Sequence, residues 1–263
     1  IPVIGDDLTL WIRGDYVISG ATLNRFFALH VIALPLVLVI LVFLHIVALH
    51  EVGSNNPDGV DTKKPKGTVP DEEKPKFKFH ERFTSKKDIV DSIPFFPYYI
   101  IKDMFGFGVF LFVFCYVIFF NPEMGGFFLE PPNFEPANPL KTPEHIAPVW
   151  YFTPFYAILR AVPDKLFGVI LMFAAIVFLA LLPWIDRGKV RSIRFRSVLH
   201  KLNLTVFAIS FIVLGYLGTQ PATPVATIFA QIFTFLYFAF FGLLWFYSKR
   251  EKTKPVPERV TSK

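Results

Sequence analysis

The stretch that decides the fold is residues 22–50, TLNRFFALHVIALPLVLVILVFLHIVALH. It contains no acidic residue and one arginine near its start, and it is longer than the roughly 20 residues that a helix needs to cross a bilayer. Backbone groups in lipid must be satisfied internally, and the run is far too long for a barrel strand. The sequence therefore predicts a transmembrane helix here.

Four further apolar runs follow along the chain, and each is expected to cross the membrane as a helix. They cover about residues 101–120, 166–185, 199–217 and 227–247. The chain of 263 residues is 53% hydrophobic and 17% aromatic, which is more apolar than an ordinary soluble domain. The expected fold class is all-α, a polytopic transmembrane helical bundle with five spans present.

The basic residues indicate how the chain is oriented in the membrane. They gather in the first and third connecting loops and in the tail after residue 247, whereas the second loop holds few and the fourth holds none. The positive-inside rule then places the C-terminus in the cytoplasm and the second loop, residues 121–164, outside. Because the net charge of +6 follows membrane topology, no nucleic-acid partner is expected.

Two histidines within the first span suggest metal chemistry. His30 and His45 are 15 residues apart, so on a regular helix they project within roughly 60° of each other, about 22 Å apart along the axis. That geometry suits two separate axial haem ligands and excludes a single zinc site. Two alternatives remain open: hydrogen bonds to a neighbouring helix, or a proton relay in a transporter. His50, about 140° round from His45, can equally be a solvated helix-end residue.

Four separated motifs resemble a known family. They are residues 21–30 (ATLNRFFALH) with His45 and residues 50–57 (HEVGSNNP), then 96–103 (FPYYIIKD), 148–152 (PVWYF) and 156–160 (YAILR), with weaker matches at 191–196 and 218–221. In this order they resemble cytochrome b of the respiratory cytochrome bc complex (ubiquinol–cytochrome c reductase), bacterial type. The resemblance spans nearly the whole chain, and it implies that the chain is the C-terminal portion of such a cytochrome b.

The resemblance implies eight transmembrane helices, of which this chain would supply the last five. It also implies two b-type haems. His30 would be an axial ligand of the low-potential haem near the outer face, and His45 would be an axial ligand of the high-potential haem near the cytoplasm. The second ligand of each would lie on N-terminal cytochrome b helices preceding Ile1. We find no signal peptide, and the start at Ile1 suggests a fragment.

The resemblance further implies a quinone-reduction site on the cytoplasmic side. His50 and Asp103 would flank it, with Ser54, Asn55 and Lys102 close by. A histidine and a carboxylate at the water boundary can deliver the two protons that quinone reduction consumes. The simpler alternative for Lys102 and Asp103 is charge at a helix entry.

A quinol-oxidation site is implied in the outward loop, with one departure from the family. The family's Pro-Glu-Trp-Tyr motif reads Pro148-Val149-Trp150-Tyr151, so the glutamate that accepts a quinol proton is replaced by valine. We hypothesise that Glu144 takes over this role together with Tyr151, because quinol oxidation needs a nearby base. Glu144 can also be an ordinary loop carboxylate. The pocket would be lined by Pro148, Val149, Trp150, Tyr151, Phe152 and Tyr156, although aromatic residues also anchor loops at membrane interfaces.

A second departure concerns the spacing of the haem histidines. The mitochondrial pattern has one residue fewer between them, and the longer spacing resembles photosynthetic relatives and some bacterial forms. Pro35 within the span can accommodate the extra residue through a kink or a local bulge.

The expected organisation has four parts. Residues 1–57 would be the haem-ligand helix with flanking loops, including a loop over residues 1–24, and 58–93 a charged cytoplasmic loop. Residues 94–248 would hold four helices and the outward loop, whose apolar part folds against the bundle, and 249–263 a basic cytoplasmic tail. Cys115 is expected to be a packing residue.

The resulting prediction is a proton-translocating quinol–cytochrome c oxidoreductase subunit in the bacterial inner membrane. It would use ubiquinol and ubiquinone and contact membrane lipid, a Rieske-type iron–sulfur protein, a cytochrome c-type subunit and a second copy of the complex. Two alternatives stay open: a dihaem b-type anchor of another oxidoreductase, and a proton-coupled transporter with a histidine relay.

Overall fold

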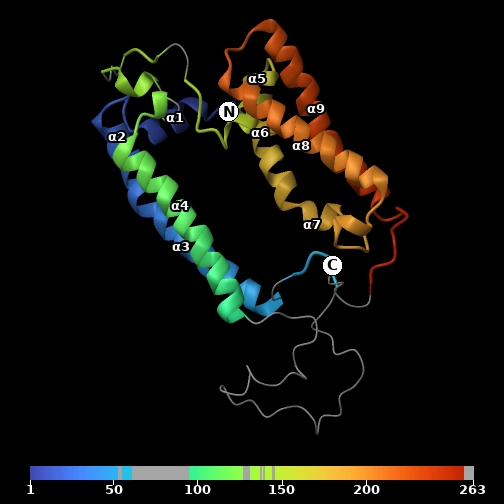
Figure 1. Ribbon diagram of the computed structural model, residues 1–263. Coiled ribbons are helices and arrows are strands. Elements are labelled where there is room, and N and C mark those ends of the chain that lie inside the picture. Colours follow the sequence, from blue (N-terminus) through green and yellow to red (C-terminus); the bar gives the residue numbers. More distant parts are fainter. Residues whose placement is uncertain are drawn as a thin grey trace. The chain divides into compact units, whose positions relative to one another are not determined.

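The computed structural model describes residues 1–52, 55–60, 95–126, 131–136, 138, 140–143 and 146–257. Within these ranges every regular element is a helix, as the sequence predicts (Figure 1). The chain forms two compact units, residues 1–57 with 137–256 and residues 58–136 with 257–263. Each is described by itself.

The first unit begins with a short helix that sequence analysis missed. We expected a loop over residues 1–24, but α1 (Gly5–Arg13) is helical and α2 (Gly20–Ala28) begins within the same stretch. Gly14 ends α1 in a left-handed conformation, φ 81°, which glycine adopts without steric cost. Ser19 then caps α2, with its partner Thr22 completing a capping box.

One long helix carries all three histidines of the first span. It consists of α2, the π-helical turn η1 (Leu29–Ala33) and α3 (Leu34–Val52), and we call it the histidine helix. The most apolar part of the histidine helix has a mean hydropathy high enough for a membrane span, and none of its residues is buried against the rest of the chain. The predicted first span is therefore confirmed to within two residues at each end.

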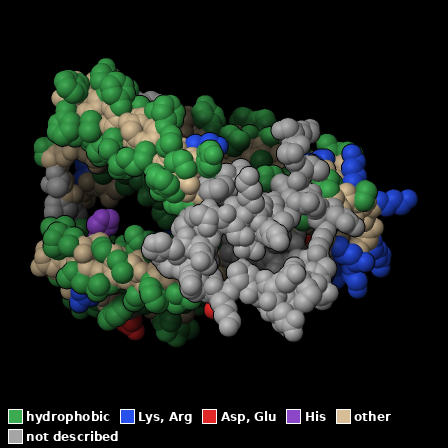
Figure 2. Space-filling model, turned by 60° about the horizontal axis from the view of Figure 1, so that its bottom comes forward, with side chains coloured by type: hydrophobic (Ala, Val, Ile, Leu, Met, Phe, Trp, Pro, Cys, Tyr) green, Lys and Arg blue, Asp and Glu red, His purple; other side chains and the backbone are tan. Residues whose placement is uncertain are grey.

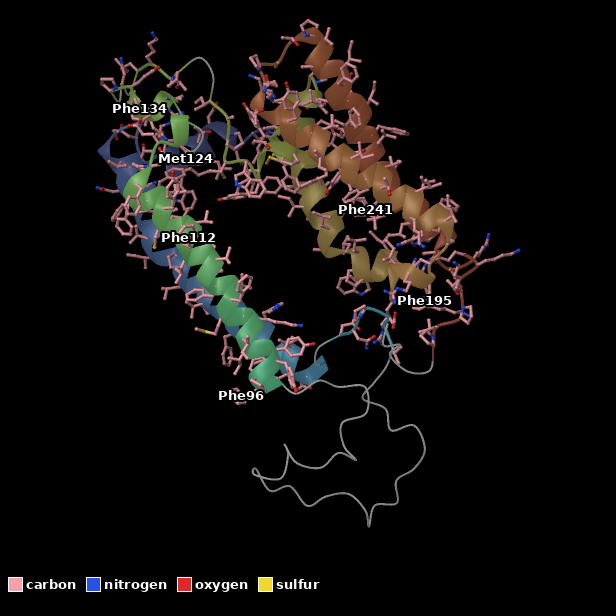
Figure 3. The ribbon with its side chains drawn as sticks, viewed as in Figure 1. Phe96, Phe112, Met124, Phe134, Phe195 and Phe241 are labelled. Atoms are coloured by element: carbon pink, nitrogen blue, oxygen red, sulfur yellow. The ribbon has the colours of Figure 1, made fainter. Side chains whose placement is uncertain are left out.

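The second unit contains α4 (Ile100–Phe120), preceded by the π-helical turn η4 (Phe95–Tyr99). It agrees with the predicted second span and ends at Phe120, with Asn121 as its C-cap. Its side chains, such as Phe112, project outward from the helix, and none is buried (Figure 3). Cys115 is half-buried on this helix.

The remaining helices of the first unit pack together. They are α5 (Thr153–Ala161), α6 (Lys165–Ala180), α7 (Leu182–Ile185), α8 (Val198–Thr219) and α9 (Pro224–Tyr247) (Figure 1). α8 and α9 lie side by side, with α5 against both and against α6. Tyr237 and Phe241 of α9 are almost fully buried in the core, and the Tyr237 hydroxyl donates to the Ala175 carbonyl at 3.0 Å. The predicted fourth and fifth spans are α8 and α9, and the expectation that the second loop folds against the bundle is confirmed for α5.

The third predicted span is wrong as a single helix. Residues 166–185 are divided into α6, of 16 residues, and the four-residue α7, with the break at Leu181. Pro183 explains the break, because it lacks the N–H that would bond the carbonyl of residue 179 and its ring clashes there. Among the described residues, four helices are long and apolar enough to cross a membrane, where five were expected.

The exposed surface of these helices is strongly apolar. Hydrophobic side chains cover much of the visible helical surface in Figure 2. A soluble protein rarely exposes contiguous apolar area on this scale. Lipid is the solvent that fits such a surface, and the protein is a membrane protein.

Candidate functional site

The histidine helix contains a local bulge beside Pro35. The Leu34 N–H bonds the Leu29 carbonyl, five residues back, so the turn holds one residue more than an α-helical turn. The bulge ends just before Pro35, which confirms the expected local adjustment. With one residue absorbed, the 15-residue separation rotates like about 14 residues, which brings His30 and His45 within about 40° of each other.

Both histidines are exposed on the histidine helix, His30 within the π turn and His45 in α3. Neutral imidazole is an ordinary axial ligand of haem iron, and exposure on a membrane helix leaves each ring available to a group held between helices. Among the described residues no three His, Cys, Asp or Glu side chains gather as a metal cluster. Two exposed imidazoles 15 residues apart on one helix can each supply one axial ligand to a separate haem iron.

The predicted quinone-reduction residues are divided between the two units. His50, in the last turn of α3, lines a shallow groove with Phe43, Val47 and Glu51. The side-chain oxygen of Asn55 accepts a hydrogen bond from the backbone N–H of Asn56 at 2.9 Å. The other two candidates, Lys102 and Asp103, lie near the start of α4. The Lys102 ammonium nitrogen lies 5.7 Å from the centroid of the Tyr99 ring, and Asp103 is exposed. Ser54 lies outside the described residues. Their grouping into one site remains a prediction.

The predicted quinol-oxidation residues, in contrast, are brought together. Residues 149–152, which we call the aromatic turn, close on themselves through the Phe152 N–H, which donates to the Val149 carbonyl at 2.8 Å. The turn then leads directly into α5, which carries Tyr156. Trp150, Tyr151 and Phe152 are exposed, and their rings contact in sequence at centroid distances of 5.6 and 5.1 Å. Pro148 and Tyr156 are half-buried, and Glu144 lies outside the described residues.

The helix α5 positions this turn, and two glycines allow it to dock. A Cβ on Gly168 of α6 would come within 2.5 Å of the Leu159 carbonyl oxygen, and one on Gly218 of α8 would overlap the Thr153 carbonyl. Thr153 is itself buried, with its hydroxyl donating to the Trp150 carbonyl at 2.6 Å. The first residue of α5, to which the aromatic turn is hydrogen-bonded, thus rests against α8 through a contact that only glycine permits.

Replacing Gly218 by alanine is expected to displace α5 and the aromatic turn. The new methyl overlaps backbone, which cannot rotate away, so the cost is that of overpacking, about 1–3 kcal/mol. Thermal unfolding of the intact protein should show a lower midpoint. Gly242→Ala on α9 is the matched control, since nothing lies within 4 Å of its Cβ position. Equal behaviour of the two variants would contradict the docking role.

A buried ion cluster lies at the opposite end of α8 and α9, and sequence analysis missed it. It consists of Asp186, Arg196 and Glu251. The Arg196 guanidinium, 4% exposed, bonds both Asp186 carboxylate oxygens at 2.8 and 2.9 Å and lies 2.5 Å from Glu251. Glu251 also accepts the Ser197 hydroxyl at 2.7 Å. The cluster fastens the tail to the loop that contains Phe195, labelled in Figure 3.

Within the ion cluster, Asp186 and Arg196 stabilise each other's charged forms. Burial raises the pKa of the Asp186 carboxyl, but hydrogen bonds from Arg196 and the Gly188 N–H outweigh it and hold the pKa below the ordinary value. Burial alone would lower the pKa of the Arg196 guanidinium, but the neighbouring carboxylates of Asp186 and Glu251 outweigh burial and raise it above its ordinary value. Since the Asp186 pKa is lowered on folding, its stabilisation is present above about pH 4 and is lost as the pH falls through the lowered value.

Two family models match the chain. The model for "Cytochrome b(N-terminal)/b6/petB" matches residues 1–126, and that for "Cytochrome b(C-terminal)/b6/petD" matches residues 136–238. Cytochrome b of Allochromatium vinosum is 57% identical over all of this chain and 61% of its own length. Cytochrome b of Rhodospirillum rubrum is 46% identical over all of this chain and 58% of its own.

A solved structure agrees with the sequence comparison. A chain of a hyperthermophilic respiratory Complex III superposes with a TM-score of 0.76 at 37% identity, covering 94% of this chain and 57% of that one. The chain thus spans about three fifths of the length of the relatives that it matches. The two family models together include the histidine helix and the aromatic turn.

The fold and the site define a polytopic all-α membrane protein with histidines inside a span and an aromatic turn docked on its helices. The chain belongs to the cytochrome b family of the cytochrome bc complexes. This family binds b-type haem and quinone. Because the N-terminal model matches residues 1–126, the earlier restriction to a C-terminal portion of cytochrome b is too narrow.

Proposed function

We propose that the protein is the haem-carrying, quinone-handling subunit of a quinol–cytochrome c oxidoreductase. The observation that carries this proposal is the histidine helix, which presents two exposed imidazoles on one side through a bulge of one residue. When bound, two b-type haems supply one-electron transfer between the two membrane levels. His30 and His45 would each hold one iron, and N-terminal cytochrome b helices outside this sequence would provide the second ligand.

The aromatic turn is proposed to bind quinol on the outer side. Trp150, Tyr151 and Phe152 form a largely apolar surface, and Pro148, Val149 and Tyr156 complete the lining. Apolar rings favour a quinol ring and exclude water around it, which preserves the strength of any hydrogen bond made there. A Rieske-type iron–sulfur protein and a cytochrome c-type subunit would receive the electron released outward.

Quinone reduction is proposed on the cytoplasmic side. His50 and Asp103 would transfer protons to quinone, with Ser54, Asn55 and Lys102 holding its carbonyl oxygens. Protons would then be taken up inside and released outside, which is the charge separation of a Q cycle. The basic loops support this orientation, in a bacterial inner membrane with the C-terminus in the cytoplasm. The complex would be a homodimer surrounded by lipid.

Changing Glu144 to glutamine is expected to slow quinol oxidation about 100-fold, because a positioned base contributes at least that much. The measurement is the pre-steady-state rate at which quinol reduces the b haems in the intact complex. Glu135→Gln, an exposed carboxylate in the same loop, is the matched control. Unchanged turnover in Glu144→Gln would remove Glu144 from the mechanism.

The proposed function is tested on the intact complex in native membranes. Ubiquinol should reduce the b haems and then cytochrome c, and inhibitors of the quinol-oxidation site should block both steps. Haem bands that ubiquinol cannot reduce under these conditions would contradict the assignment as a quinol-oxidising subunit.

A further inference from the structure

Arg160, in the last turn of α5, is held from two directions at once. One guanidinium nitrogen, Nη2, donates to the Leu217 carbonyl at 2.7 Å and to the Gln220 carbonyl at 2.9 Å. These carbonyls lie at the C-terminal end of α8, where the helix carries partial negative charge, and the Leu217 carbonyl also accepts the Gln220 N–H at 3.2 Å. A guanidinium bonded to both therefore joins α5 firmly to the end of α8.

The same guanidinium stacks on the ring of Tyr156. Its central carbon lies 4.6 Å from the ring centroid, one helical turn away along α5. The stacking is a cation–π contact, and the planar guanidinium fixes the plane of the ring beside it. The backbone N–H of Tyr156 donates to the Phe152 carbonyl at 3.0 Å, which links the backbone that carries this ring to the aromatic turn.

We propose that Arg160 is a positioning residue for quinol oxidation. By bonding the two carbonyls at the end of α8 while it stacks on Tyr156, Arg160 holds the Tyr156 ring in one orientation at the quinol pocket. The inference rests on the proposed function, because it assigns Arg160 a role in that same site. Arg160 acts through Tyr156 and does not itself touch the quinol.

A second residue ties α5 to the bundle without contacting Tyr156. Gln231 of α9 donates from its side-chain amide to the Ala161 carbonyl at 2.9 Å. Its loss would loosen the same end of α5 by one hydrogen bond but leave the guanidinium on the Tyr156 ring. Gln231→Ala therefore separates docking of the helix from orientation of the ring.

The test uses the intact complex with Arg160→Lys and Arg160→Ala. Lysine keeps the charge but has neither the planar stack nor the fork that reaches two carbonyls. We expect kcat for quinol oxidation to fall about 10-fold with lysine and about 100-fold with alanine, as misplaced reacting groups do. The KM for quinol, the haem content and the rate of quinone reduction should stay near wild type. Gln231→Ala should stay close to wild-type kcat.

A double-mutant cycle distinguishes positioning of the Tyr156 ring from a general structural role of Arg160. In a Tyr156→Leu background, Arg160→Lys should have little further effect on kcat, because the ring it positions is gone. The inference would be overturned if Arg160→Lys and Tyr156→Leu lowered kcat independently, so that their effects multiply. It would also be overturned if the Arg160 variants left kcat unchanged or lost activity only in proportion to lost haem. If Arg160→Ala does not assemble, the lysine variant and the cycle still decide. A wild-type complex that does not oxidise quinol overturns the proposed function and this inference together, whereas the other outcomes overturn the inference alone.

Discussion

Replacing His45 by leucine in the intact protein is expected to remove one of two b-type haem signals and to leave the other. Leucine has a similar volume and suits a membrane helix, but it offers no lone pair to iron. His30→Leu should remove the other signal. The measurement is haem stoichiometry per polypeptide, together with reduced-minus-oxidised difference spectra of the purified variants.

The reason for expecting separate losses is the distance between the two rings. They are about 22 Å apart along the histidine helix, so no single group can bind both. Ile40→Ala is the matched control, since Ile40 is exposed on the same helix but lies about 140° round from His45. The control should keep both haems. If either histidine variant also kept both, the axial-ligand assignment would be wrong.

The second large effect is expected at the ion cluster. Arg196→Ala removes the cation shared by Asp186 and Glu251 and leaves two carboxylates without it, one of them only 2% exposed. Breaking a buried pair in this way costs about 3–5 kcal/mol. Thermal unfolding of the intact protein in detergent should therefore show a midpoint lower by on the order of 10 °C.

The comparison variant for the ion cluster is Lys252→Ala. Lys252 is a neighbour of Glu251 in sequence but is exposed, so its loss should change the midpoint very little. Proteolysis adds a second observation, because the tail is held to Phe195 by the Lys254 N–H at 2.8 Å and should be cleaved faster in Arg196→Ala. Matching midpoints for Arg196→Ala and Lys252→Ala would show that the cluster does not hold the tail.

The sequence predicted those features that depend on local composition and spacing. Long apolar runs gave the histidine helix, α4, α8 and α9, and the 15-residue spacing beside Pro35 predicted a local adjustment found as the turn η1. α1 was missed because it is short and contains no long apolar run, so its C-cap at Gly14 was a weak local signal. The third span was predicted as one helix although Pro183 lies near its end, and the proline breaks it.

Features that depend on distant contacts could not be predicted. Arg160 and Gly218 each belonged to a recognised motif, but their contacts join residues 57 to 65 positions apart. Arg196 likewise meets Glu251 only because α8 and α9 return the chain to the same end. The four-residue spacing of Tyr156 and Arg160 was the one local signal, since such pairs face each other on a helix.

The most direct test of the account is the haem count of the intact wild-type protein, purified and recorded as a dithionite-reduced minus oxidised spectrum with quantified porphyrin. We expect two b-type haems per polypeptide. A preparation that is folded and colourless, with no porphyrin bound at either level of the histidine helix, would contradict the proposed function and the electron path with it.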